Sequence, residues 1–324
     1  MMKQFYLSIV IVLMFLNTKA CDICNMFVGI NPNDFKNTVS SYYRTRNYSG
    51  LIAPDNTSIS TQSGLFTNKT SHGGHAIQKA SPTYFEEHYN NYQFQGKFYI
   101  KNKFQLISSL SISNNTFLND NVISNWATGL GDLLIAGKYQ IHSTIGCGSD
   151  KHFSHRLMLG GGIKLPIGNY KIKDRTGIID YYVQPGTGSL DFLLNGTYLA
   201  KIDNIGFNIN VSYKANTTNS FKYRFANSFN NYFNLFYLIK NQHLTFMPKV
   251  GFYYEQAKRD KANKTSVSAT GGKALFGTLG LNIYYKKISM YFTYQNPIYQ
   301  YLYEVQPLNN SNFILGVSYI LTKN

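Results

Sequence analysis

Apolar and polar residues alternate through most of this sequence, and no other feature restricts the fold as strongly. Residues 205–214 alternate without an error, residues 288–295 do the same, and the pattern returns over residues 311–322. Successive side chains of a β-strand point to opposite faces. A period of two therefore predicts strands with one apolar face and one face toward water or a polar interior.

Twelve segments carry this pattern, and most of them are long. They lie near residues 38–48, 84–100, 103–113, 129–143, 155–166, 189–202, 205–215, 222–239, 243–256, 274–286, 288–297 and 311–322. Strands of soluble proteins are usually about 5–6 residues long, whereas a tilted strand that crosses a membrane needs about 9–11. Pro248 falls on the apolar face of one segment and removes a ladder hydrogen bond, so we expect a bulge or a shifted register there.

The connections between these segments alternate between tight turns and longer polar stretches. The tight turns are at residues 101–102, 203–204, 241–242 and 287, and the longer stretches are 49–83, 114–128, 167–188, 216–221, 257–273 and 298–310. Bacterial outer-membrane barrels have an even strand number, short periplasmic turns and longer outer loops. We therefore predict an all-β fold, an antiparallel up-and-down transmembrane β-barrel of about twelve strands. The turn at residues 144–154 is long for the periplasmic side.

A soluble two-sheet sandwich would also alternate, but it would expose charged side chains on its polar face. Charged residues make up only 14% of this chain, against about 25% in a soluble domain. Aromatic residues stand near strand ends on the apolar face at Phe104, Tyr139, Tyr198, Phe207, Tyr213 and Tyr254. Aromatic girdles at the two membrane interfaces explain this placement, so the membrane barrel is favoured.

The start of the chain has the features of a secretory signal peptide. Lys3 precedes an apolar run over residues 5–16, and the small residue Ala20 ends the segment. A membrane anchor is the alternative, but the run is short for about 30 Å of hydrocarbon. We expect a signal peptide over residues 1–20, a periplasmic segment over 21–37, and a barrel over 38–324 in the bacterial outer membrane.

If the apolar face meets lipid, the alternate residues point into the lumen. The charged candidates for lining and selectivity are Arg44, Arg46, Lys97, Asp132, Lys138, Arg156, Lys164, Asp191, Lys249 and Glu255. Cations outnumber acids in this set, and a cationic channel of low dielectric concentrates anions. Structural pairing is the other interpretation, in which Asp132 and Asp191 pair with Arg156, Lys164 or Lys138.

Aromatic residues share the inward face with these charges. They are Tyr42, Tyr99, Tyr232, Tyr253, Phe276, Tyr284 and Tyr291. A lumen with both cations and aromatic rings suits small amphipathic or aromatic anions. The rings could equally fill the interior, because twelve strands leave limited room.

Cysteine and histidine residues give weaker indications. Cys21 and Cys24 form a CxxC in an oxidising compartment, where a local disulfide, a redox or metal role, and free or lipidated thiols are all open. Cys147 lies near His152 and His155, which makes a mixed metal site a weak candidate, although two or three scattered ligands do not define one. We predict no cofactor.

Three motifs carry a resemblance to known families. Residues 21–25 read Cys-Asp-Ile-Cys-Asn, which resembles the CDIC-type start of exported transporter proteins of Bacteroidetes. Residues 129–134 read Gly-Leu-Gly-Asp-Leu-Leu, with Lys138 and Tyr139 following, and residues 160–168 read Gly-Gly-Gly-Ile-Lys-Leu-Pro-Ile-Gly. These two motifs are similar to strands of the outer-membrane barrel family named for the MetA pathway of phenol degradation. The resemblance implies an outer-membrane barrel that takes up hydrophobic or aromatic compounds.

Physical roles can be given to the motif residues themselves. Glycines in strands allow tight curvature and close backbone approach. Pro166 is expected to end strand pairing where an outer loop begins, and Gly168 is expected to adopt a positive φ in that loop.

The favoured function is a passive outer-membrane channel for small solutes that are aromatic or hydrophobic and anionic. Its expected partners are outer-membrane lipids and a small-molecule solute, without nucleic acid, and we expect a monomer. A closed structural or adhesive barrel that binds a partner through its outer loops is the alternative. An outer-membrane lipase built on His152 and Ser154 is less favoured, because no GxSxG or HExxH motif is present, so we predict no enzyme.

Overall fold

The structure is a computed structural model, and it describes residues 36–52, 58–59, 66–67, 83–144 and 152–321. The expected signal peptide and almost all of the expected periplasmic segment lie outside the described residues. None of the described residues forms a helix long and apolar enough to cross a membrane.

The described residues form β-strands and connections. The long strands are β1 Asn37–Ile52, β4 Thr83–Ile100, β5 Phe104–Asn119, β6 Val122–Leu130, β7 Leu133–Ser143, β8 Phe153–Leu165, β9 Asp191–Ile202, β10 Ile205–Ala215, β12 Ser228–Tyr237, β14 Leu244–Ala257, β17 Gly272–Tyr285, β18 Ile288–Leu302 and β20 Asn312–Leu321. The short ones are β2 Ser58–Ile59, β3 Phe66–Thr67, β11 Tyr223–Arg224, β13 Ile239–Asn241, β15 Lys261–Ala262, β16 Thr265–Ser266 and β19 Leu308–Asn309.

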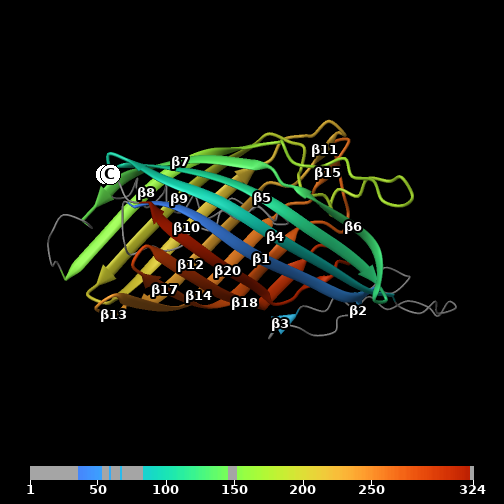
Figure 1. Cartoon of the computed structure of the whole chain (residues 1–324). Helices are drawn as coiled ribbons and strands as arrows, with labels where there is room; N and C mark the ends of the chain where they lie inside the picture. The colour runs from blue at the N-terminus through green and yellow to red at the C-terminus, as the bar shows by residue number, and fades with distance from the viewer. Residues whose placement is uncertain (1–35, 53–57, 60–65, 68–82, 145–151, 322–324) are drawn as a thin grey trace, which may run out of the picture.

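The long strands close into a barrel. Each pairs antiparallel with the next, and β1 pairs with β20 from Asn37 opposite Leu321 to Thr45 opposite Phe313. Strands β6 and β7 both pair with β5 and together occupy one place in the wall, so the ring contains twelve strands, as predicted. Figure 1 shows the strands tilted together, with tight turns at one end and longer loops at the other. We call these the inner end and the outer end.

The alternating pattern sorts side chains to the two sides of the wall. On β20, Phe313, Leu315 and Val317 are exposed on the outside of the isolated chain, whereas Asn312 and Ile314 are buried in the interior. No element of the described part of the chain packs on these exposed apolar residues, which form the surface expected to face lipid. Phe104 and Tyr139, two of the predicted girdle residues, are among those exposed.

The predicted outer loop over residues 114–128 is wrong. Strand β5 continues to Asn119, and a two-residue turn leads directly into β6. Asp120 and Asn121 both have positive φ, at 48° and 65°. Asp and Asn tolerate this left-handed conformation, and such a turn matches the twist of the flanking strands. The hairpin therefore extends the wall beyond its predicted height.

Strand β18 also continues past the predicted end at residue 297. The register between β17 and β18 shifts at Leu275 and Phe276, where Pro297 lies opposite Phe276 and Tyr299 lies opposite Leu275. The extra residue, Ile298, forms a β-bulge that lets pairing resume beyond the proline.

Two smaller predictions also need correction. The segment 222–239 is not one strand: β11 joins β15 and β16 in a separate three-stranded sheet at the outer end, and β12 begins only at Ser228. Pro248 faces outward as predicted, but it lies opposite Leu281 in unshifted register. On the other side of β14, the pairing is interrupted opposite Pro248, between the end of β12 and the start of β13.

Candidate functional site

The charged residues predicted to face the lumen do point inward. Nine of the ten are buried, namely Arg44, Arg46, Asp132, Lys138, Arg156, Lys164, Asp191, Lys249 and Glu255, and Lys97 is half-buried. Eight of the ten form two ion-paired groups near the outer end and one basic group nearer the inner end. The other two, Arg44 and Lys249, lie on β1 and β14.

The first group is built around Lys164 at the end of β8. Its Nζ lies 3.1 Å from the Asp132 carboxylate and 2.6 Å from that of Asp191, and all three side chains are buried. Asp132 also accepts hydrogen bonds from the backbone N–H and hydroxyl of Thr187, at 2.9 and 2.8 Å. Of the open pairings, the structure thus contains those with Lys164, and they hold the loop between β8 and β9 against the wall.

Two glycines bring the backbone of this loop close to the break between β6 and β7. A Cβ on Gly168 would lie 2.7 Å from the backbone of Gly131 and 2.8 Å from the Leu130 oxygen, and one on Gly186 would lie 2.9 Å from both Gly168 and Asp132. The expected positive φ at Gly168 is wrong, because Gly168 is absent from the positive-φ glycines of the described chain. Close approach, not an unusual φ, is the reason for a glycine there. Strand β8 does end just before Pro166, as expected.

The second group connects β1 to β14, two strands of the wall that are separated by β17, β18 and β20. Arg46 on β1 donates two hydrogen bonds to the Glu255 carboxylate on β14, at 3.1 and 2.5 Å, and a third to Asn309 at 2.9 Å. Tyr253 donates to the same carboxylate at 2.7 Å, and its ring stacks on Tyr232 with centroids 4.2 Å apart. These contacts neutralise the buried charges and cross-link the wall.

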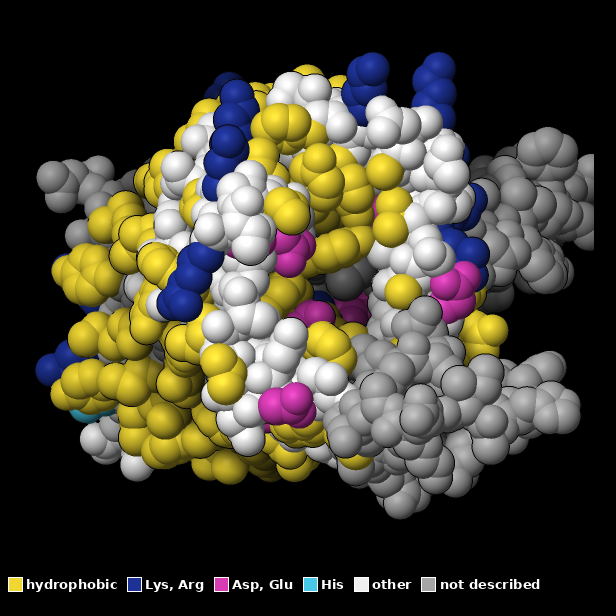
Figure 2. Space-filling view, turned by 90° about the vertical axis from the view of Figure 1, so that its right-hand side faces the viewer, with side chains coloured by type: hydrophobic (Ala, Val, Ile, Leu, Met, Phe, Trp, Pro, Cys, Tyr) yellow, Lys and Arg dark blue, Asp and Glu magenta, His cyan; other side chains and the backbone are white. Residues whose placement is uncertain are grey.

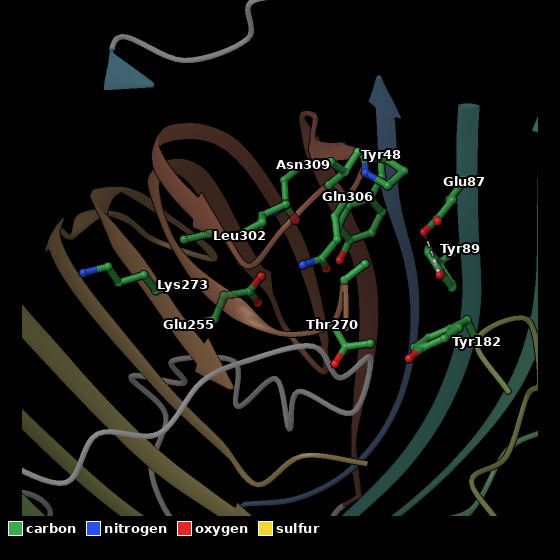
Figure 3. Close-up of a pocket in the computed structure, with 14 residues that line it drawn as sticks. Tyr48, Glu87, Tyr89, Tyr182, Glu255, Thr270, Lys273, Leu302, Gln306 and Asn309 are labelled. Carbon is green, nitrogen blue, oxygen red and sulfur yellow. Dashed lines mark hydrogen bonds between the residues drawn. The ribbon is translucent and has the colours of Figure 1, made fainter. Parts of the chain in front are cut away.

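A cavity of about 220 Å³ opens beside Arg46 and Glu255 at the outer end. It is lined by Tyr48, Glu87, Tyr89, Tyr182, Glu255, Ala269, Thr270, Lys273, Ala274, Leu302, Val305, Gln306, Pro307 and Asn309. Figure 3 shows side chains from the strands and from the loops pointing into this space. Figure 2 shows the same end of the barrel with a central hollow and acidic side chains in and beside it. The outer end of the barrel therefore contains a cavity that is partly covered by loops.

The third group is cationic and lies deeper. Lys138 on β7 is only 1% exposed and donates a hydrogen bond to Thr197 at 3.1 Å. Lys97 on β4 and Arg156 on β8 are near enough to act on it electrostatically. These three basic side chains lie in the part of the lumen toward the inner end.

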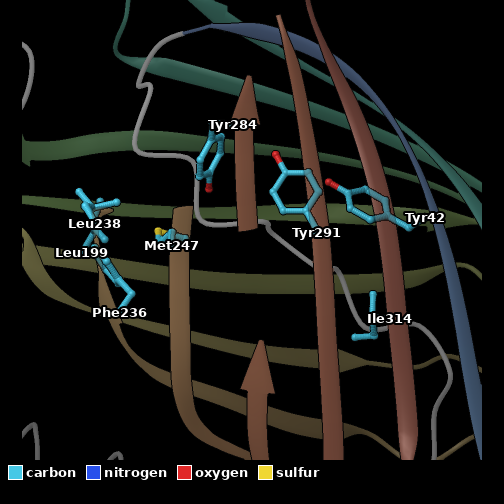
Figure 4. Close-up of a cluster of buried hydrophobic side chains, with 8 residues drawn as sticks. All are labelled: Tyr42, Leu199, Phe236, Leu238, Met247, Tyr284, Tyr291 and Ile314. Carbon is cyan, nitrogen blue, oxygen red and sulfur yellow. The ribbon is translucent and has the colours of Figure 1, made fainter. Parts of the chain in front are cut away.

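An apolar cluster inside the lumen was only partly predicted. It contains the expected Tyr42, Tyr284 and Tyr291, and also Leu199, Phe236, Leu238, Met247 and Ile314 (Figure 4). Alternation had assigned polar character to this face. The signal that could have revealed it is the continuous apolar run over residues 235–239, because such a run places apolar side chains on both faces of a strand.

A buried carboxyl group ties the outer loops together outside the barrel wall. Asp260 accepts hydrogen bonds from the hydroxyls of Tyr223 and Tyr182, at 2.7 and 3.1 Å, and from the Ala226 N–H at 2.7 Å. Burial is the main influence on this group, and it raises the pKa of the Asp260 carboxyl above its ordinary value. Loops that follow β8, β10 and β14 therefore meet at one acid.

The histidine predictions find little geometric support, and Cys21, Cys24 and Cys147 lie outside the described residues. His152 accepts or donates a 2.9 Å hydrogen bond to Asp203 at an exposed inner turn, while His155 lies against His142 with ring centroids 4.8 Å apart. Within the described ranges, no three His, Cys, Asp or Glu residues are grouped to hold a metal ion. The Ser154 hydroxyl is buried inside and the His152 ring is exposed outside, so the pair considered for a lipase does not form.

The comparison with protein families shows which family the chain belongs to. A family model described as "Putative MetA-pathway of phenol degradation" matches residues 57–287, more than two thirds of the chain. The chain belongs to this family. No curated protein matches it significantly. The family and the fold together identify an outer-membrane β-barrel.

A solved channel structure supports this fold, and two other barrels are more distantly similar. The COG4313 outer membrane channel from Pseudomonas putida F1 is 11% identical, with a TM-score of 0.59 over 90% of this chain and 100% of that one. The β-domain of the Bordetella autotransporter BrkA is 9% identical, with a TM-score of 0.45 over 89% and 100%. The CymD monoaromatic hydrocarbon channel is 7% identical, with a TM-score of 0.38 over 90% of each chain. At 11% identity, the first of these structures supports the fold alone.

Proposed function

We propose that this family member is an outer-membrane channel for the passive passage of small solutes that are aromatic or hydrophobic and anionic. The observation that carries the proposal is a closed barrel with an apolar exterior, a hollowed outer end and a charged, partly aromatic interior. A barrel that served only as an anchor would not need buried cations along its axis. The similar fold of a solved outer-membrane channel supports the same function, and the family description supports aromatic solutes.

The proposed selectivity residues fall into two classes by their contacts. Arg46, Glu255 and Lys164 are held in ion pairs, so they shape the lumen more than they attract solutes. Lys138, which is buried in the lumen and donates a hydrogen bond to the Thr197 hydroxyl, is the better candidate for anion preference. The channel needs no cofactor or catalytic residue for this function.

The start of the mature chain is included in the proposal. The resemblance of residues 21–25 to exported Bacteroidetes transporters supports cleavage after residue 20 and a periplasmic segment that reaches the barrel at Asn37. In an oxidising compartment, Cys21 and Cys24 would form a local disulfide. Mass spectrometry of the mature protein, with and without reduction, tests both points: an unprocessed N-terminus or two free thiols would contradict them.

Conductance tests the channel itself. Purified protein in planar bilayers, with different KCl concentrations on the two sides, should conduct with a reversal potential that favours chloride. Lys138→Met should move this potential toward zero, because it removes a buried cation from the lumen. Lys287→Gln, at an exposed turn, is the matched control and should leave it unchanged. Silent bilayers from correctly folded protein would refute the channel and favour a closed barrel that acts through its outer loops.

A further inference from the structure

Three loops at the outer end carry an excess of positive charge. Residues 166–190, 216–227 and 258–271, which follow β8, β10 and β14, contain nine Lys and Arg residues but only three Asp residues. Figure 2 shows Lys and Arg side chains projecting from the upper rim of this end. Within the described part of the chain, Arg259 is the only one of the nine in an ion pair, with Glu304.

The three acids of these loops are engaged inside the protein. Asp260 is buried under its hydrogen bonds from Tyr223 and Tyr182. Asp174 accepts hydrogen bonds from backbone N–H groups of its own turn, and Asp180 accepts one from the Asn125 side chain at 3.2 Å. The acids therefore do not compensate the cations on the outer surface of the loops.

The small sheet of β11, β15 and β16 brings cations together on one face. Arg224 lies directly opposite Lys261, so their Cβ atoms are about 5 Å apart on the same face of the sheet. Tyr223 is buried and donates to Asp260, so alternation places Arg224 and Lys261 on the opposite, outer face. Like charges directly opposite each other destabilise a sheet, and a bound anion would relieve that repulsion.

Two further cations border this pair. Lys222 precedes β11, and Lys264 lies in the turn between β15 and β16. The backbone N–H of Asn263 donates to the Lys222 oxygen at 3.0 Å, which holds the two segments together. Lys222, Lys261 and Lys264 are exposed. We call Lys222, Arg224, Lys261 and Lys264 the basic patch.

The basic patch lies next to the outer aromatic girdle. Tyr213 and Tyr254 stand on the outward faces of β10 and β14 near their outer ends, where aromatic rings mark the membrane interface. The Asn227 side-chain amide donates a hydrogen bond to the Tyr213 hydroxyl at 3.0 Å, and its oxygen accepts one from Arg224 at 3.2 Å. Two hydrogen bonds thus connect the patch to the girdle, which puts it at the level of the lipid headgroups.

An exposed aromatic ring adjoins the patch. Phe221, next to Lys222 in the chain, is 36% exposed. The ring of Tyr170 packs against it with centroids 5.8 Å apart, and Lys171 lies over Tyr170 at 5.2 Å. Cations beside an exposed apolar ring match a ligand with both an anionic and an apolar part, as residues at a membrane interface do.

We propose that the basic patch and Phe221 form a binding site for the phosphorylated headgroup of a glycolipid in the outer leaflet of the membrane. Arg224 and Lys261 contact one phosphate, for which a guanidinium supplies two parallel donors. Lys222 and Lys264 add charge at its edges, and Phe221 contacts the apolar part of the lipid. This site goes beyond the channel function, because an open and a closed barrel could both contain it.

Direct lipid binding tests the site, by native mass spectrometry of the full-length protein from uncharged detergent micelles. The probes are diphosphoryl lipid A, the same lipid without phosphates, and inorganic phosphate as a competitor. One cation facing an anionic lipid surface contributes roughly fivefold in affinity, so the phosphorylated lipid should bind at least tenfold more tightly than the other lipid. Equal binding of the two lipids would overturn the proposal. Displacement by an equal concentration of inorganic phosphate would also overturn it, since the ligand would then be free phosphate.

Two double variants locate the site. Arg224→Gln with Lys261→Gln should weaken binding of the phosphorylated lipid roughly twentyfold. Lys240→Gln with Lys287→Gln removes the same charge from exposed positions at the inner end, and it should leave binding unchanged. Equal losses in the two variants would show that only net charge matters and would overturn the site. Wild-type affinity in the first variant would overturn it as well.

Hydrogen exchange gives a second measurement that net charge does not control. The phosphorylated lipid should slow exchange of the amides in β11, β15 and β16 of the wild-type protein several-fold, because it bridges strands that repel each other. The Arg224→Gln and Lys261→Gln variant should show no such slowing. Protection that is the same in both proteins would contradict a lipid held by this pair.

Discussion

Replacing Lys164 by Met should strongly destabilise the barrel. The change removes a buried cation that lies 3.1 Å from Asp132 and 2.6 Å from Asp191, and it leaves two carboxylates in the wall. Breaking a buried ion pair on one side usually costs about 3–5 kcal/mol. Hydrogen bonds from Thr187 to Asp132 and from Ser189 to Asp191 remain, and they partly stabilise the two carboxylates that have lost their cation. We therefore expect a loss of about 3 kcal/mol in the free energy of unfolding.

Urea unfolding in lipid vesicles measures this loss, with the fluorescence of Trp126 on β6 as the reporter and a linear extrapolation to water. Arg259→Gln is the matched control. Arg259 also lies within 2.8 Å of a carboxylate, that of Glu304, but its side chain is 39% exposed. An exposed pair contributes at most about 1 kcal/mol, so this variant should stay close to wild type.

A rescue variant completes the experiment. Adding Asp191→Asn to Lys164→Met removes one of the two stranded carboxylates and should recover at least half of the lost stability. Two results would refute the reasoning. One is a Lys164→Met variant no less stable than Arg259→Gln, and the other is a double variant less stable than Lys164→Met alone.

Three further predictions concern the loop glycines, the Arg46–Glu255 pair and Asp260. Gly186→Ala should lower the free energy of unfolding by about 1–3 kcal/mol, because its Cβ would lie 2.9 Å from Asp132. In the same urea assay, Gly196→Ala should lower it less, because its Cβ would lie 3.3 Å from a leucine methyl. Glu255→Gln should destabilise by about 3 kcal/mol, measured likewise, since it leaves Arg46 buried without its carboxylate; a neutral effect would contradict this. Burial raises the pKa of Asp260, so the folded loops hold its proton more tightly than the unfolded chain, and their stability falls as the pH rises above about 4. Hydrogen exchange of the outer loops should show this fall, and Asp260→Asn should flatten it; parallel profiles for the two proteins would exclude it.

The strand pattern could be predicted from the sequence because successive side chains of a barrel strand point alternately to the outside and to the lumen. Each inward position assigned by alternation on β1, β8 and β14 lies inside the structure, including Arg44, Arg156 and Lys249. Predictions failed where polar residues continued a strand. Asp120 and Asn121 form a tight turn at the top of an extended hairpin, and composition alone could not distinguish such a hairpin from a loop.

Contacts across the lumen could not be predicted in the same way. Arg46 and Glu255 are 209 residues apart and belong to strands that do not pair with each other. Their meeting depends on the tilt and closure of the whole barrel, which alternation does not contain. Lys164 was one of three possible partners for Asp132 and Asp191, and the choice depends on where the loop after β8 folds back.

The motifs that resemble the family explain the fold better than the solute. Gly131, Asp132, Lys164 and Gly168 all belong to the contact that fixes the loop between β8 and β9. These residues therefore build a scaffold that barrels with different solutes can share. The apolar cluster and Lys249 also face the lumen, and they lie outside those motifs. Exchanging those side chains should alter solute preference while the barrel stays folded, whereas exchanges among the motif residues should lower stability before they alter preference.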